Sequence, residues 1–115
     1  MYKIVHRGEI WLVNWNPGRG SEQTGIRPAL IIQNEMGSAN PNYGNVIILA
    51  ISTKSSLVPF HIKILPDPKN GLSEISYIKC EQMMTIAKDR LINKLGVLDK
   101  NSMDKVWEPV IRILQ

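Results

Sequence analysis

The feature that most constrains this chain is an uninterrupted apolar run at residues 46–51, with the sequence VIILAI. Six residues are far fewer than the roughly 20 that a membrane-spanning helix needs. The run does not alternate between apolar and polar residues, so it is typical of a strand that is covered on both faces. We therefore expect it to be the central strand of a sheet, followed by a hydroxyl-rich turn at residues 52–56.

The segments around this run also have the patterns of short strands, separated by turns that contain glycine or proline. Strands are predicted at residues 9–15, 29–33, 60–64, 73–80, 83–86 and 91–97, with a loop that contains one helical turn at 34–45. Turns are expected at 66–71 and 88–90.

The C-terminal segment, residues 99–114, has a different period. Its apolar residues, among them Val106 and Val110, recur at helical spacing. Asp99 or Ser102 is expected to cap this helix, and Pro109 to kink it near Trp107. Many short strands followed by one terminal helix predict a small, mainly β, barrel-like α+β domain that takes in residues 1–115.

The charge is modestly basic and unevenly distributed. The formal net charge is +4 at pH 7. Residues 1–66 hold six Lys or Arg against three acids, whereas residues 67–115 hold eight against seven. The excess in the first half favours a phosphate-bearing partner, although a surplus that serves only solubility is equally compatible with these numbers.

Several classes of protein are disfavoured by what the sequence lacks. It has no signal-peptide pattern and no apolar run of membrane-spanning length, and its single cysteine, Cys80, has no disulfide partner. The two histidines fall in no metal-ligand pattern, and the nucleotide-binding fingerprints are missing. We therefore expect a cytoplasmic protein that needs neither a metal nor another cofactor.

The most distinctive stretch is residues 18–28, with the sequence GRGSEQTGIRP. Its glycines let the backbone approach a sugar-phosphate chain, and Arg27 can donate two parallel hydrogen bonds to a phosphate. Because Arg27 precedes a predicted buried strand, we expect it to be preorganised and partly desolvated. Ser52 and Thr53, after the central strand, add hydroxyls. Structural roles compete with this anion site, since Arg27 can pair with Glu22 and the hydroxyls can start a turn.

The motifs resemble one family, in order, along nearly the whole chain. RGEIW at 7–11, GSEQTGIRP at 20–28, IIQN at 31–34, IST at 51–53, EQMMTI at 81–86 and MDKV at 103–106 are similar to segments of the MazF/PemK toxins of bacterial toxin–antitoxin pairs. The resemblance implies an SH3-like barrel of the plasmid-toxin (CcdB-like) type with a C-terminal helix, and a homodimer. It also implies a sequence-specific, metal-independent endoribonuclease that cuts single-stranded mRNA, arrests growth and is neutralised by a cognate antitoxin.

The resemblance assigns catalysis to Arg27 and to a hydroxyl after the central strand. The family has a threonine where this chain has Ser52, and Thr53 follows at once, so both are candidates. Residues expected to contact RNA are Arg19, Gly20, Ser21, Glu22, Gln23, Lys54, His61 and Gln82. In the implied reaction the RNA 2′-OH attacks the adjacent phosphorus, which leaves a 2′,3′-cyclic phosphate and a 5′-OH. Arg27 would stabilise the developing charge, and the general base is unassigned, with Glu22 and His61 as the candidates.

Two other classes of function remain open at this level. One is a non-catalytic barrel that binds RNA or protein, and the other is a toxin of related fold that poisons DNA gyrase. The combination of an arginine with hydroxyls favours the ribonuclease, because a gyrase poison has no need of an anion site.

Overall fold

The computed structural model describes residues 1–16 and 25–115 of the chain. In chain order the elements are β1 (Glu9–Asn14), β2 (Ile26–Ile31), α1 (Glu35–Ser38), β3 (Asn45–Ser52), β4 (His61–Ile64), β5 (Ser76–Ala87), a 3₁₀ turn (Lys88–Arg90), β6 (Leu91–Val97) and α2 (Lys100–Leu114). Neighbouring strands pair antiparallel in the order β4-β5-β3-β2-β1-β6. The predicted mainly β fold with a C-terminal helix is confirmed.

β3 lies inside the sheet, between β5 and β2, as the apolar run predicts. Its alternate residues enter two different cores. Leu49 and Ile51 pack in a core that includes Val106 of α2. Ile48 and Ala50 pack in a second core on the other face. Both faces of β3 are therefore covered, which is why its sequence shows no alternation.

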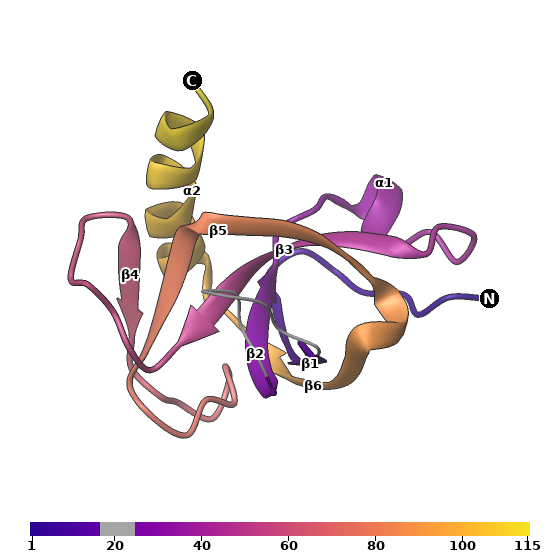
Figure 1. Cartoon of the computed structure of the whole chain (residues 1–115), viewed down its shortest axis with the longest axis horizontal. Coiled ribbons are helices and arrows are strands. Elements are labelled where there is room, and N and C mark those ends of the chain that lie inside the picture. The colour runs from indigo at the N-terminus through magenta and orange to yellow at the C-terminus, as the bar shows by residue number, and fades with distance from the viewer. Residues whose placement is uncertain (17–24) are drawn as a thin grey trace.

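The sheet curves around the second core. Figure 1 shows β5 crossing the molecule and turning through the 3₁₀ segment into β6, while α2 stands beside β5 and β4. The second core accordingly combines Val46 of β3 with Ile86 of β5 and Leu91 of β6. This curvature gives the barrel-like form that the pattern of short strands predicts.

β2 begins earlier than the sequence predicts, at Ile26 instead of Ala29, and ends at Ile31 instead of Gln33. A proline inside a strand argues against the strand, because it cannot donate a ladder hydrogen bond. Here Pro28 pairs with β1, whereas the pairing of β2 with β3 starts only at Ala29, so its missing N–H leaves no gap in the β3 ladder.

β5 is one long strand where the sequence predicts two. A β-bulge joins the two parts. Ala50 of β3 pairs with Lys79, but the residue before it, Leu49, pairs with Met83. The polar residues Glu81 and Gln82 lie in this bulge and give the sequence its interrupted pattern. The predicted strand over residues 73–75 is wrong, since β5 begins at Ser76.

α2 is capped by Asp99, whose carboxylate accepts from the backbone N–H of Ser102 at 3.0 Å. The helix continues through Pro109 to Leu114. At the other end of the chain, the guanidinium of Arg7 lies 4.7 Å from the ring centroid of Trp107 and donates from Nε to the carbonyl of Ile32 at 2.9 Å. The N-terminal segment is thereby fixed against α2.

Glu9, the first residue of β1, is a nearly buried carboxylate that joins two strands. It accepts from Trp11 Nε1 at 3.0 Å and from the backbone N–H of His6 at 2.9 Å, and it pairs with Lys94 of β6 at 3.0 Å. Burial alone would raise the pKa of Glu9, but these hydrogen bonds and the Lys94 charge bring it below its ordinary value.

Candidate functional site

Arg27, Ser52 and Thr53, the three predicted catalytic residues, line one cleft of about 380 Å³. The start of β2 and the end of β3 lie at the same end of the sheet, so the two antiparallel strands present these residues together. Ala29 pairs with Ala50. Continuing this antiparallel register by two residues, which keeps the same face of the sheet, places Arg27 opposite Ser52. The structure therefore brings Arg27, Ser52 and Thr53 together in one cleft.

Arg27 is exposed, which corrects the expectation that it is partly desolvated. It is the second residue of β2 and lies before the stretch that β3 covers, so its side chain stays near solvent. Its backbone is nevertheless held: it pairs with Val13, and its carbonyl accepts from Nε1 of the buried Trp15 at 3.3 Å. The backbone that carries this cleft-lining side chain is thus held in place by the sheet.

The two hydroxyls differ in their surroundings. Ser52 is half-buried as the last residue of β3, and its Oγ accepts from the backbone N–H of Lys54 at 3.1 Å. That hydrogen bond leaves the Ser52 O–H available as a donor. Thr53 is exposed just beyond the strand, beside the exposed Lys54.

His61 belongs to a hydrogen-bonded cluster rather than to the cleft lining. Its Nδ1 lies 2.8 Å from Ser55 Oγ, and its Nε2 lies 2.9 Å from a carboxylate oxygen of Glu81. An ionised carboxylate only accepts, so Nε2 carries the proton that faces Glu81. The His61 side chain is only 5% exposed, and Ser55 Oγ also accepts from the N–H of Leu57 at 2.9 Å.

Gln82 is half-buried and follows Glu81 in the β5 bulge, outside the lining of the cleft. The Arg27 cleft and the His61 cluster are connected through residues 52–55, a single short turn. The predicted RNA-contacting residues Arg19, Gly20, Ser21, Glu22 and Gln23 lie outside the described residues, so their roles stay predictions.

Sequence reasoning missed three polar side chains that line the cleft, namely those of Ser73, Glu74 and Ser76. They belong to a segment whose pattern predicts a plain strand. What brings them to the cleft is a preceding turn, in which the nearly buried Asn70 accepts from the N–H of Leu72 at 2.9 Å. The run of Asp, Pro, Asn and Gly at 66–71 signals this turn, but not the neighbour on which it packs.

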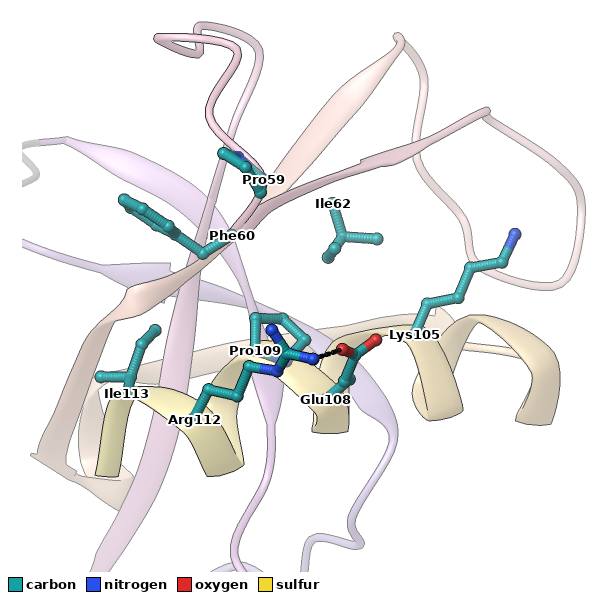
Figure 2. A pocket seen from close by; sticks show the side chains of 8 residues that line it. All are labelled: Pro59, Phe60, Ile62, Lys105, Glu108, Pro109, Arg112 and Ile113. Carbon is teal, nitrogen blue, oxygen red and sulfur yellow. Dashed lines mark ion pairs between the residues drawn. The ribbon is translucent and has the colours of Figure 1, made fainter. Parts of the chain in front are cut away.

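A second cavity, of about 470 Å³, lies between α2 and the start of β4. Figure 2 shows its lining, in which Phe60 and Ile62 face Pro109 and Ile113 of the helix, with the ion pair of Arg112 and Glu108 at 2.9 Å along one side. None of the predicted site residues within 25–115 lines it. Its apolar walls suit packing, whereas the smaller cleft combines a permanent positive charge with hydroxyls.

Two further findings concern the parts of the chain that the structure describes. Within residues 1–16 and 25–115, no three or more His, Cys, Asp or Glu side chains lie close enough together to hold a metal ion. In the same ranges, no helix has both the length and the apolar character needed to cross a membrane.

Cys80 is fully buried in the first core, and burial, together with the nearby Glu81, raises the pKa of its thiol to about 12.

The structure is similar to several solved toxins. It superposes on MazF from Deinococcus radiodurans with a TM-score of 0.80, at 19% identity, over 97% of each chain. A mycobacterial endoribonuclease, solved in complex with its cognate antitoxin, gives a TM-score of 0.76 at 22% identity and covers 96% of this chain and 94% of its own. At these identities the likeness establishes the fold.

Sequence comparison gives closer relatives. The chain is 39% identical to endoribonuclease EndoA of Bacillus subtilis over 106 residues, which is 91% of this chain and 90% of that protein. It is 38% identical to endoribonuclease MazF of Staphylococcus saprophyticus over 105 residues, 90% of this chain and 85% of that one. A family model for the PemK-like, MazF-like toxins matches residues 6–114. The chain therefore belongs to the family of PemK-like, MazF-like toxins of type II toxin–antitoxin systems.

Proposed function

We propose that this protein is a sequence-specific endoribonuclease that cuts single-stranded mRNA without a metal ion and is neutralised by a cognate antitoxin. The observation that carries the proposal is the cleft in which Arg27 stands beside Ser52 and Thr53. Family membership and the names of the two relatives, both endoribonucleases, support it.

The cleft suits cleavage by the RNA itself. The 2′-OH loses its proton and attacks the adjacent phosphorus, and the bond to the 5′ oxygen of the next nucleotide breaks. That oxygen takes up a proton, so a 2′,3′-cyclic phosphate and a 5′-OH remain. Arg27 is always protonated, so it stabilises the charge that develops on the phosphoryl oxygens instead of supplying a proton. Ser52, whose O–H is available, donates to one of these oxygens. The exposed Thr53 contacts the RNA strand beside Ser52.

His61 is better suited to positioning than to acting as general base. Both of its ring nitrogens are engaged, one by Ser55 and one by Glu81, and the ring is nearly enclosed. A base needs a free nitrogen within reach of the 2′-OH. In this proposal His61 fixes the turn at 52–55 and so keeps Ser52 facing Arg27.

The proposal also includes the setting in which the toxin acts. Its substrate is mRNA, so it works in the cytoplasm, as a homodimer of a single domain spanning residues 1–115. A cognate antitoxin binds it and blocks its activity, in keeping with the complex solved for its structural relative.

The decisive experiment is the variant Arg27→Ala, assayed on a long single-stranded RNA with mapping of the cut ends. We expect cleavage to fall at least 100-fold, because one electrostatic donor to the developing charge is typically worth ~3–4 kcal/mol. Arg112→Ala is the matched control: Arg112 is an exposed arginine on α2, outside the cleft, and its loss should leave cleavage unchanged.

Wild-type protein that binds RNA without cutting it would instead identify a binding module. Inhibition of DNA gyrase with intact RNA would identify a gyrase poison. Full activity of Arg27→Ala would contradict the proposed mechanism. Excess EDTA should leave the rate unchanged, and a marked loss of rate with the chelator would exclude metal-free cleavage.

A further inference from the structure

Glu74 is an acidic residue in a cleft that, by the proposed function, receives a polyanion. It lines the same cavity as Arg27 and Ser52. It is exposed, and its carboxylate has no hydrogen-bond or ion-pair partner among the residues that the structure describes. A negative charge here opposes phosphate binding, so any contact it makes with RNA has to involve another part of the nucleotide.

The backbone around Glu74 is held firmly. Ser76, only 3% exposed, donates from its Oγ to the Glu74 carbonyl at 2.9 Å. The preceding turn is braced by Asn70, whose side chain accepts from the N–H of Leu72 and donates to the carbonyl of Leu65 at 3.0 Å. The carboxylate therefore stands on a preorganised segment, as a group that discriminates between ligands requires.

This turn is also fixed to the sheet. The backbone N–H of Val97 donates to the carbonyl of Lys69 at 2.8 Å. Gly71 and Gly96 allow the turn and β6 to approach so closely that a Cβ on either residue would overlap the backbone of the other segment. The distance between the Glu74 segment and the strand that carries Arg27 is thus set by backbone packing.

The chemistry of a carboxylate determines which group of a nucleotide can form a hydrogen bond with it. An ionised Glu only accepts hydrogen bonds. Cytosine, adenine and guanine each carry an exocyclic amino group that donates, whereas uracil presents two carbonyl oxygens and a single ring N–H. Glutamate is a known acceptor for the cytosine amino group in nucleic-acid recognition.

We propose that Glu74 is a specificity-determining residue that accepts a hydrogen bond from the exocyclic amino group of a base next to the scissile phosphate. Arg27 then binds the phosphate while Glu74 binds the base edge, and the two opposite charges orient the strand in the cleft. This inference rests on the proposed ribonuclease function and adds to it a rule for the base: one that carries an amino group is preferred over uracil.

The test uses short RNA oligonucleotides built on the mapped cleavage site, with each of the four bases placed in turn on either side of the scissile phosphate. For the wild type we expect, at one of the two positions, cleavage roughly 5- to 100-fold faster with an amino-bearing base than with uracil. Glu74→Gln keeps the size but can both donate and accept, so the ratio should fall towards one, mainly through faster cleavage of the uracil substrate. Glu108→Gln, the same change in the other cavity, is the control and should keep the wild-type ratio.

Binding of the corresponding 2′-O-methyl oligonucleotides, which lack the attacking hydroxyl, gives a second measurement that does not depend on cleavage. The same preference should appear in the dissociation constants and should disappear in Glu74→Gln. If wild-type protein shows this preference in binding but cuts no RNA, the proposed function fails and the role of Glu74 stands.

Four results would overturn the inference. An equal loss of rate for all bases in Glu74→Gln would make Glu74 a general base. An equal gain in binding for all bases would make it a simple repulsive charge. A wild-type protein that treats uracil like the other bases at both positions, or that binds none of the oligonucleotides, leaves Glu74 without the assigned role.

Discussion

Substitution of Gly71 by alanine should loosen the wall of the cleft, and its effect can be separated into two parts. Gly71 has φ +70°, a left-handed conformation that costs an L-residue about 1–2 kcal/mol. In addition, a Cβ at Gly71 would stand 2.6 Å from the carbonyl carbon of Leu95 and closer still to its oxygen. Real Cβ atoms do not come so close, so the turn has to move away from β6.

Two other glycines isolate these parts. Gly8 has φ +92° but open space around its Cβ position, so Gly8→Ala has only the conformational cost. Gly96 lies outside the left-handed region, yet its Cβ would stand 2.5 Å from the carbonyl carbon of Asn70, so Gly96→Ala has only the steric one. We expect a destabilisation of about 1 kcal/mol for Gly8→Ala, after ~0.4–1 kcal/mol is recovered from the stiffer unfolded chain. For Gly96→Ala we expect about 2 kcal/mol, the usual range for overpacking being ~1–3 kcal/mol.

Gly71→Ala combines both costs and should destabilise the protein by about 3 kcal/mol. The double variant Gly71→Ala/Gly96→Ala should lose less than the sum of the single changes, because either one alone already separates the turn from β6. Urea unfolding followed by circular dichroism measures these differences as shifts of the midpoint at constant slope. If Gly71→Ala is no less stable than Gly8→Ala, the packing of the turn on β6 is not what fixes this wall.

Four further predictions concern other parts of the molecule. The folded pKa of Glu9 is lowered from its ordinary value of 4.5, so its interactions stabilise the folded protein fully above pH 4.5 and are lost as the pH falls through the folded pKa. In urea unfolding at a series of pH values, Glu9→Gln should therefore lose less stability below pH 4.5 than the wild type does. Cys80 should not react with a thiol reagent at pH 8 in the native protein and should react fully in denaturant, since it is buried with a pKa of about 12; rapid labelling of the native state would contradict this. Asp99→Ala removes the cap of α2 and should cost about 1 kcal/mol in thermal or urea unfolding, with no change in the cleft. Leu57, exposed at φ +54°, is strained, so Leu57→Asn should raise stability by up to about 1 kcal/mol, and a loss of stability would show that the side chain is needed where it is.

The parts of the site that the sequence predicts well are those carried by local patterns. The apolar run at 46–51 indicates a strand with two covered faces, and Ser52 and Thr53 necessarily follow it. Arg27 lies near the start of β2, and two neighbouring antiparallel strands present the start of one and the end of the other at the same end of the sheet. These relations depend only on neighbours in the sequence and on the alternation of side chains.

What could not be predicted depends on contacts between distant segments. The exposure of Arg27 follows from how far β3 extends along β2, and Pro28 indicates a later start of the strand than the one observed. The inclusion of Glu74 in the cleft follows from the packing of the 65–73 turn on β6, more than 20 residues further along the chain. No single pattern encodes the three-residue shift that lets β5 continue past Cys80.

The pairing of β1 with β6 determines when, during its synthesis, the toxin can form a complete cleft. Glu9 pairs with Val97, so this ladder joins the first strand to the last, and closing so long a loop is slow compared with forming local hairpins. While a nascent chain still has β6 inside the ribosome, Leu95 is missing from the cleft and the Glu74 segment has no strand to rest on. Truncated chains released before residue 97 should therefore be inert, and ribonuclease activity should arise only after β6 has left the ribosome.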